Sequence, residues 1–391
     1  MRPLLIRNAT LLLPGARQSS GALRAEGDTI TWIGPTEAAP ADPTAVVFDA
    51  GGQLLSPGLI DLQLNGAFGR DFTAEPAAVW PVAAQLPRFG VTAFLPTIIT
   101  APPGAMEAAQ AALAQPPDKD TIRAQPLGLH LEGPFLNPAR RGAHPPEHLR
   151  APDPTPAAAW SPATGVRLVT LAPELPGALP LIETLAARGV VVSLGHTDAA
   201  YAQAQAGLAA GARYGTHLFN AMAPFSHREP GVIGALLEAA PVAVGLIADG
   251  VHVHPSAVRL AWRAKGPDHL CLVSDAMAGL GLGAGRYQLG GREVLVDGNA
   301  ARLADGTLAG SLLSLDEAVR RLQRFTGCDF ADAVAAASAV PAAVLGLPER
   351  YGRLAEGARA DLVLWTAERQ VAATWVGGRL ACQRAPRQTA P

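Results

Sequence analysis

Apolar residues gather in eight short runs in the middle of the chain, and longer stretches of mixed character separate them. Most of these runs are continuously apolar, which is typical of strands covered on both faces. Several of the stretches between them have the spacing of amphipathic helices, namely 77–88, 104–114, 177–188, 199–210 and 255–265. The eight runs are 59–64, 91–97, 127–132, 166–172, 190–196, 213–219, 242–249 and 270–275, of which 213–219 is the weakest strand candidate. Eight such units in about 250 residues predict an α/β fold, a (β/α)8 TIM-type barrel.

The two ends of the chain carry a different pattern. Residues 1–52 and 352–383 alternate apolar and polar positions with breaks at Gly, Asn and Asp, which predicts short strands. The simplest packing joins both ends in one composite β-sandwich, although two separate sheets would produce the same pattern. We therefore expect a small β-sandwich domain from residues 1–54 and 346–391, and a barrel from residues 55–345.

A glycine-rich insert at 279–311 follows the eighth run and predicts at least two hairpin-like strands. The sequence SLDE comes next, with Ser314 and Glu317 three residues apart. This is the spacing of a capping box, so we expect a helix to begin at Ser314.

Composition narrows the class of protein. The chain has 391 residues, 49% hydrophobic and 16% charged, which suits a globular enzyme. The formal charge of −2 gives no reason to expect nucleic acid or a membrane surface as a partner. Cys271, Cys328 and Cys382 are far apart and odd in number, so no disulfide framework is expected. With no secretory leader and no long apolar stretch, we expect a cytoplasmic protein.

Polar residues stand at the carboxyl ends of the predicted strands, where barrel active sites lie. They are Gln63, Asn65, Glu132, His196, His217, Asp249, His252 and Asp275. Each one alone has an ordinary structural explanation. A histidine at a strand end is more often simply hydrogen-bonded, Glu132 could pair with Arg140 or Arg141, and Asp275 could cap a turn. Their coincidence on one rim favours chemistry.

One glutamate and two histidines form a ligand set of catalytic zinc sites and leave a position open for water or substrate. Such an ion polarises a carbonyl and lowers the pKa of water to about 7. A nearby carboxylate must then act as base and later as acid. Glu132, His196 and His217 are the candidate ligands, and Asp275 is the candidate base.

Seven segments resemble one known family. They are 56–72, 128–144, 193–199, 215–235, 248–255, 272–277 and 308–311, and they include HLEGPF and THLFNAM. In these segments the chain resembles the N-acetylglucosamine-6-phosphate deacetylase family of the amidohydrolase superfamily. The resemblance covers residues from about 50 to 315 in the family's order.

The resemblance implies hydrolysis of the acetamide of N-acetylglucosamine 6-phosphate, in a homodimer. It implies that Glu132, His196 and His217 bind the metal, and that Asp275 and His144 are catalytic. Arg228 would pair with the sugar phosphate, a role suited to a guanidinium. His252 would hold sugar hydroxyls or phosphate, in its own or the neighbouring subunit. The implied substrate contacts are Gln63, Ala143, His144, Asn220, Ala221, Arg228, His252, Leu308, Ala309 and Gly310.

One departure bears on the metal count. Many members of the superfamily have His-x-His after the first strand, whereas this chain has Gln63-Leu64-Asn65, and amides are poor zinc ligands. The only lysines, Lys119 and Lys265, do not follow a predicted strand, so no lysine is expected as a bridging ligand. We expect one divalent ion per subunit. The ligand set favours Zn²⁺, although Fe²⁺, Co²⁺ or Mn²⁺ would also fit.

Two alternatives remain at this stage. The same chemistry could act on N-acetylgalactosamine 6-phosphate or on a non-sugar amide, because the shape of the pocket separates these substrates. A catalytically inactive relative would have lost Glu132, a metal histidine or Asp275, and all of them are present.

Overall fold

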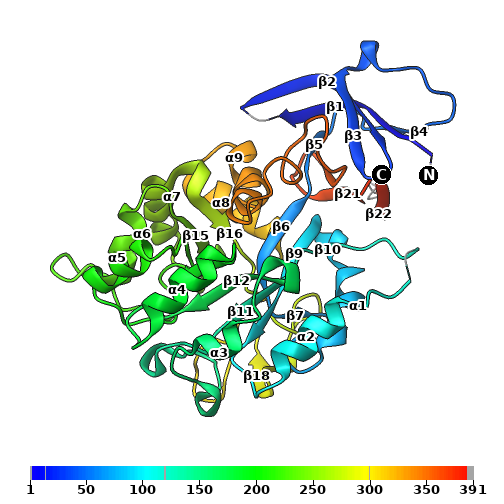
Figure 1. Cartoon of the computed structure of the whole chain (residues 1–391). Coiled ribbons are helices and arrows are strands. Elements are labelled where there is room, and N and C mark those ends of the chain that lie inside the picture. Colours follow the sequence, from blue (N-terminus) through cyan, green and yellow to red (C-terminus); the bar gives the residue numbers. More distant parts are fainter. Residues whose placement is uncertain (1, 14, 119, 299, 385–391) are drawn as a thin grey trace.

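The computed structural model describes residues 2–13, 15–118, 120–298 and 300–384. A barrel of parallel strands and surrounding helices forms the larger part (Figure 1). A mixed sheet made from the two ends of the chain packs beside it, with blue and red strands next to each other (Figure 1). Lys119 lies outside the described residues.

The eight predicted runs all form strands of one parallel sheet, which confirms the predicted barrel. Neighbours pair in the order β6, β9, β11, β12, β13, β14, β15, β16. A parallel bridge between Leu64 and Ala276 brings the last strand back to the first, and Asp275 N–H donates to Gln63 O over 2.8 Å. The bounds are β6 (Leu59–Leu64), β9 (Val91–Ile99), β11 (Leu129–Glu132), β12 (Val166–Leu171), β13 (Val191–Leu194), β14 (Tyr214–Gly215), β15 (Ala243–Leu246) and β16 (Leu270–Leu272). A short β10 (Gln125–Pro126) also pairs with β9.

Helices follow most strands and cover the outside of the barrel (Figure 1). They are α2 (Ala105–Leu113), α4 (Ala178–Ala187), α5 (Tyr201–Ala209), α6 (Gly231–Glu238), α7 (Pro255–His269), α8 (Leu315–Thr326), α9 (Phe330–Ala335) and α10 (Ala339–Val344). The helix expected at 77–88 is broken into α1 (Val79–Ala83) between the turns η2 (Pro76–Ala78) and η3 (Leu86–Phe89). Pro87 accounts for the break after α1, because it has no backbone N–H to donate to the carbonyl oxygen of Ala83, whereas Pro81 lies in the first turn of α1 and is tolerated there.

The predicted capping box is wrong, although the helix does start where expected. Ser314 is the N-cap residue of α8, but its side chain makes no cap hydrogen bond. The carboxylate of Glu317 instead accepts hydrogen bonds from Arg320 and Arg321, over 2.9 and 2.7 Å. Two guanidinium partners on the same face hold this carboxylate away from the N-terminus of the helix.

Both ends of the chain contribute to one mixed sheet, so the alternative of two separate sheets does not hold. The order is β22-β21-β20-β5-β1-β2-β3, with β4 also paired to β1. The bounds are β1 (Leu4–Leu13), β2 (Ala16–Glu26), β3 (Thr29–Pro35), β4 (Val46–Asp49), β5 (Leu54–Pro57), β20 (Leu362–Trp365), β21 (Val371–Val376) and β22 (Arg379–Gln383). The sheet has an apolar core of its own, and Trp365 packs against Phe330 of α9 to join it to the barrel.

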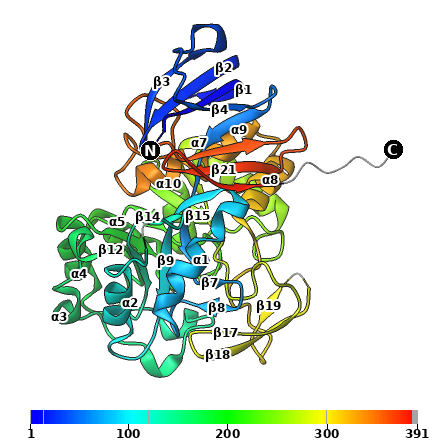
Figure 2. The ribbon, with the colours of Figure 1, turned by 90° about the vertical axis from the view of Figure 1, so that its right-hand side faces the viewer.

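The glycine-rich insert forms a small antiparallel sheet, as predicted. It contains β17 (Gly285–Leu289), β18 (Arg292–Val296) and β19 (Ala301–Arg302), and lies at the end of the barrel away from the mixed sheet (Figure 2). Its apolar side chains share a core with Ile99, at the carboxyl end of β9, and with Ala143. The insert therefore covers the rim where the barrel strands end. A two-stranded sheet of β7 (Gly66–Ala67) and β8 (Arg70–Asp71) follows the first barrel strand.

Short elements complete the part of the chain that the structure describes. They are η1 (Thr36–Ala38), η4 (Pro138–Arg140), η5 (Pro146–His148), η6 (Pro162–Thr164) and α3 (Pro154–Ala157). Among the described residues, we find no helix whose length and apolar character would allow it to cross a bilayer.

Candidate active site

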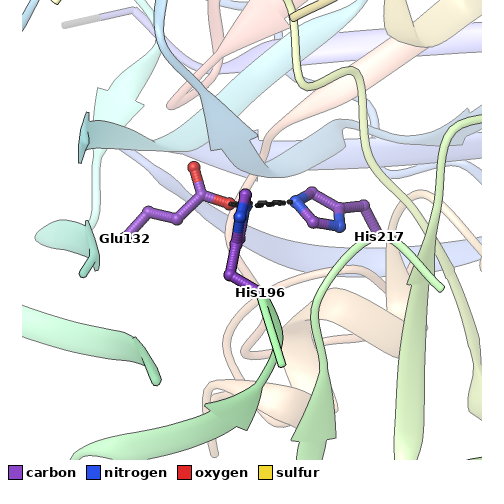
Figure 3. A group of neighbouring side chains, drawn as sticks. All are labelled: Glu132, His196 and His217. Atoms are coloured by element: carbon purple, nitrogen blue, oxygen red, sulfur yellow. Dashed lines mark hydrogen bonds and ion pairs between the residues drawn. The ribbon is translucent and has the colours of Figure 1, made fainter. Parts of the chain in front are cut away.

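Three side chains from the carboxyl ends of β11, β13 and β14 converge at one point of the barrel rim (Figure 3). Glu132 is the last residue of β11, and His196 and His217 each come two residues after their strands, β13 and β14. The Glu132 Oε1 atom lies 3.2 Å from His196 Nε2 and 3.0 Å from His217 Nε2, and the two Nε2 atoms are 3.1 Å apart. Bonds of about 2.0–2.1 Å in a tetrahedral zinc site place ligands roughly 3.3 Å from one another. The spacing fits one divalent ion.

The chemistry of these donors also fits a cation. The Nδ1 atom of His196 lies 2.9 Å from the carbonyl oxygen of Arg140 and donates to it, which leaves a lone pair on Nε2. Burial, and after it the nearby His144, lowers the pKa of His196 to about 4, so this ring is neutral at neutral pH. Burial opposes the ionisation of Glu132, but the surrounding imidazoles outweigh it and hold the pKa of Glu132 well below its usual range. A carboxylate and a neutral imidazole are the forms in which these residues bind metals.

Glu132 does not pair with Arg140 or Arg141, which removes the structural alternative for this residue. Arg140 pairs with Asp198 over 2.7 Å, and Arg141 reaches the carbonyl oxygen of His144. Gln63 donates from Nε2 to Glu132 Oε1 over 2.8 Å. The amide therefore presents a donor to the carboxylate rather than a lone pair to the centre.

Asp275 stands three residues beyond the end of β16 and is half-buried at the same rim. Its Oδ1 atom accepts a hydrogen bond from Asn65 Nδ2 over 2.8 Å. Burial, and after it the negative charge of Glu132, raises the pKa of Asp275 to about 6. A carboxyl group with a pKa close to neutrality can both take up and release a proton at physiological pH.

His144 has a defined tautomer. The backbone N–H of Thr100 donates to His144 Nδ1 over 3.2 Å, so Nδ1 carries the lone pair and Nε2 carries the hydrogen. The Nε2 atom lies 3.6 Å from Glu132 Oε2, on the same side as the three converging ligands. The ring can therefore donate a hydrogen bond beside the centre.

A cavity of about 470 Å³ opens above these groups. Most of the sequence-predicted site residues line it, namely Glu132, Ala143, His144, His196, His217, Asn220, Ala221, His252, Asp275, Leu308 and Gly310. Three do not: Gln63 lies behind Glu132, Ala309 is fully buried, and Arg228 is exposed on the loop before α6. Larger crevices exist, such as one of about 950 Å³ beside Trp80, but they lack a converging ligand group among the described residues.

His252 is held from behind by a carboxylate. Its Nδ1 atom lies 2.6 Å from Asp249 Oδ2, while Asp249 Oδ1 accepts the backbone N–H groups of Val251 and His252. The hydrogen bond that Nδ1 donates to Asp249 fixes the orientation of the ring and leaves Nε2 for the cavity, which His252 lines. Asp249 and His252 thus act together.

The backbone at the site is strained. His196, His217 and Asp275 have φ angles of 49°, 26° and 47°, in the left-handed region that disfavours non-glycine residues. Phe219 and Ala221, beside His217, have φ angles of 79° and 50°. Such conformations cost about 1–3 kcal/mol each and persist only where the surrounding structure holds them.

Several residues of the site were not foreseen from the sequence. Thr100 orients His144, Glu174 binds the loop that carries His196, and Arg302 of the insert lines the cavity. An acidic residue in TLAPE, just after the fourth predicted strand, was a usable signal for Glu174. No local signal placed Arg302, because the insert reaches the rim only through its packing.

Comparison with known proteins defines the class. A sequence profile of the Amidohydrolase family matches residues 54–381, and the chain belongs to this family of hydrolases.

Three similar proteins carry the same activity in their names. The N-acetylglucosamine-6-phosphate deacetylase of Homo sapiens is 44% identical over 351 residues, which are 86% of this chain and 85% of the human protein. The crystal structure of the Pasteurella multocida N-acetylglucosamine-6-phosphate deacetylase superposes with a TM-score of 0.90 at 32% identity, over 97% of this chain and 99% of that chain. A mutant of the Mycobacterium smegmatis enzyme in complex with N-acetyl-D-glucosamine-6-phosphate gives a TM-score of 0.87 at 35% identity, over 97% and 100% of the two chains.

Proposed function

We propose that the protein hydrolyses the acetamide of N-acetylglucosamine 6-phosphate to glucosamine 6-phosphate and acetate, with one divalent ion held by Glu132, His196 and His217. The convergence of these three ligand atoms within 3.2 Å, below a cavity, is the observation that carries the proposal. Deacetylation is the activity named for the relatives, with which the chain shares most of its length. When bound, the ion would act as a Lewis acid toward the substrate carbonyl and the attacking water.

Asp275 carries the proton in the proposed reaction. The oxygen of water attacks the acetamide carbon, and Asp275 takes a proton from this water. The carbon–nitrogen bond then breaks, acetate forms, and Asp275 returns the proton to the amine nitrogen. The hydrogen bond from Asn65 holds one carboxylate oxygen still, so that the other can serve both transfers.

His144 donates from Nε2 to the carbonyl oxygen of the acetamide in this proposal. Its orientation is supported by the Thr100 backbone, which occupies Nδ1. A preorganised donor of this kind stabilises negative charge as it develops on the oxygen in the transition state. Gln63 would contribute indirectly, by orienting Glu132.

The proposal includes one ion per subunit, with Zn²⁺ as the expected metal and Fe²⁺, Co²⁺ or Mn²⁺ as substitutes. Gln63 and Asn65 donate their amide N–H groups to Glu132 and Asp275, and the amide oxygens that remain are poor zinc ligands. Lys265 donates to the carbonyl oxygens of Leu236 and Ala239, away from the cavity. Neither kind of residue supports a second, bridged ion.

The direct test is acetate release from the metal-loaded protein. We expect rapid release from N-acetylglucosamine 6-phosphate, and slower release from its unphosphorylated and galacto analogues. Absence of acetate from all three compounds would contradict the proposed function. Equal rates with and without the phosphate would remove the phosphate contact assigned to Arg228.

We propose a homodimer in which Arg228 reaches the phosphate bound to the neighbouring copy. Arg228 is exposed and outside the cavity of its own chain, and Phe225, three residues earlier in the same loop, is 56% exposed. Aromatic residues and arginine are both enriched at protein interfaces. His252 and the backbone of Asn220 and Ala221 would complete the sugar contacts.

Heterodimers provide a test of this arrangement. A dimer of one Asp275→Asn chain and one Arg228→Ala chain should recover about half of wild-type activity on the phosphorylated sugar, because one of its two sites is complete. Two affinity tags allow its isolation. If the heterodimer is no more active than the Arg228→Ala homodimer, Arg228 does not act across the interface. Activity on the unphosphorylated sugar should be unaffected by Arg228→Ala and serves as the control.

We also propose a reducing compartment, the cytoplasm, for this protein. Its three cysteines, Cys271, Cys328 and Cys382, are all unpaired. Unpaired thiols of this kind are the rule where glutathione and thioredoxin keep proteins reduced.

A further inference from the structure

Glu174 lies just after β12 and joins two loops of the active site, although it does not line the cavity. Its Oε1 atom accepts hydrogen bonds from Asn137 Nδ2 over 2.9 Å and from the backbone N–H of Asp198 over 2.7 Å. Its Oε2 atom accepts the hydroxyl of Thr197 over 2.5 Å. One half-buried carboxylate therefore ties together the loop after β11, which carries Asn137, and the loop after β13, which carries Thr197 and Asp198.

His196 is held between these same two loops. Its carbonyl oxygen accepts the backbone N–H of Asn137 over 3.0 Å, and its Nδ1 atom donates to the carbonyl oxygen of Arg140 over 2.9 Å. The guanidinium of Arg140 in turn pairs with Asp198 over 2.7 Å. In each of these contacts at least one partner is a residue that Glu174 binds or the direct neighbour of one.

The conformation of His196 requires such support. With φ at 49°, the residue is in the left-handed region, at a cost of about 1–3 kcal/mol that the surroundings must offset. Hydrogen bonds to a charged acceptor are about twice as strong as those between neutral groups. Glu174 accepts three such hydrogen bonds, which fix the loop of Asn137 and the loop of Thr197 and Asp198. These two loops hold His196 between them, and so they fix the direction of its Nε2 atom.

We propose that Glu174 is a positioning residue for the metal ligand His196 and that it sets the affinity of the site for its divalent ion. The inference rests on the proposed metal role of Glu132, His196 and His217. Glu174 acts through the Asn137 and Thr197–Asp198 loops rather than by contact with the ion. Removing a residue that orients a metal ligand without binding the ion typically weakens metal affinity by about 10–100-fold.

The experiment measures the Zn²⁺ affinity of the metal-stripped full-length protein by competition with a chromophoric chelator. Glu174→Ala should raise the Kd for Zn²⁺ by about 10–100-fold. Glu174→Gln should stay close to wild type, because its carbonyl oxygen can still accept from Asn137 and Asp198 while the Thr197 hydroxyl accepts from its amide. Rescue by this conservative variant separates positioning from a general loss of structure, and it remains informative if Glu174→Ala does not fold.

A matched control is Asp28→Ala in the mixed sheet. Asp28 also accepts from several donors, Arg350, Arg359 and Thr29, but it lies far from the cavity. This variant should lower the melting temperature without changing the Kd. The inference is overturned if Glu174→Ala binds Zn²⁺ as tightly as wild type does, or if Asp28→Ala weakens binding equally. If His196→Ala also binds as tightly as wild type, the proposed metal site itself fails, which is a distinguishable result.

Discussion

Replacing Asp275 by asparagine should lower kcat by roughly 10²–10⁴-fold while the protein keeps its metal. Asparagine has the shape of the aspartate and can remain beside Asn65, but it cannot take a proton from water or deliver one to the amine. Because Asp275 is not one of the three converging ligands, the metal content should stay unchanged. Steady-state acetate release and elemental analysis of the same sample provide the measurement.

Asp71→Asn is the matched control for this variant. Asp71 is a buried carboxylate near the rim, where it accepts the backbone N–H groups of Thr73 and Gly290 without lining the cavity. Its replacement should leave kcat within a few-fold of wild type. Near-normal turnover of Asp275→Asn would remove this residue as the base.

The pH dependence follows from the same group. The ionised form of Asp275 is the active one, so kcat/KM should fall as the pH decreases through its pKa. Burial and Glu132 raise this pKa to about 6 in the absence of a cation, and a nearby divalent ion favours the ionised form and lowers it. The acid limb of the profile should therefore have its midpoint at or below about pH 6, and Asp275→Asn should lose this limb.

Replacing His217 by alanine should remove the metal and reduce activity to that of metal-stripped protein. His217 is one of three ligands, and it lies 3.0 Å from Glu132 Oε1 and 3.1 Å from His196 Nε2. Without it, two ligands cannot hold an ion in competition with a chelator at ordinary concentrations. Metal content and acetate release should fall together. Wild-type protein stripped with a chelator should lose the same activity and regain it when Zn²⁺ is added.

His254→Ala is the control for this experiment. His254 is exposed, caps α7 by accepting the backbone N–H of Ser256, and does not line the cavity. Its loss should cost some stability but no metal. Full metal content in His217→Ala would contradict the proposed ligand set, and two ions in active wild-type protein would contradict the single site.

Much of this architecture could be predicted from local patterns. The barrel strands are buried on both faces, so each appears as an apolar run whose carboxyl end is marked by a polar residue such as Glu132 or Asp275. The RYGTHLF run was the weakest strand candidate, and β14 indeed has only two residues, Tyr214 and Gly215. The segment after it still brings His217 to the rim, because the position of a strand in the barrel does not depend on its length.

Two predictions from the sequence were wrong, the capping box at Ser314 and the continuous helix at 77–88. Ser314 and Glu317 have the spacing of a capping box, but Arg320 and Arg321 lie one turn away and bind Glu317 instead. The helix expected at 77–88 has suitable apolar spacing, yet the missing N–H group of Pro87 interrupts it. A pattern of apolar positions reports burial, and it does not report which hydrogen-bond partner a polar side chain will find.

The sequence by itself determined the barrel, the second β unit and the identity of the residues that gather at the rim. These properties follow from which segments are buried, and the order of apolar and polar residues along the chain indicates this directly. Only the tertiary structure decided how those residues are oriented. Thr100 sets the tautomer of His144, and Asn65 donates a hydrogen bond to Asp275. Gln63 donates to Glu132, and Glu174 accepts a hydrogen bond from the loop that carries His196. The tertiary structure also placed Arg228 outside the cavity of its own chain. Each of these contacts joins groups far apart in the sequence, and a hydrogen bond depends on distance and direction that no local pattern contains.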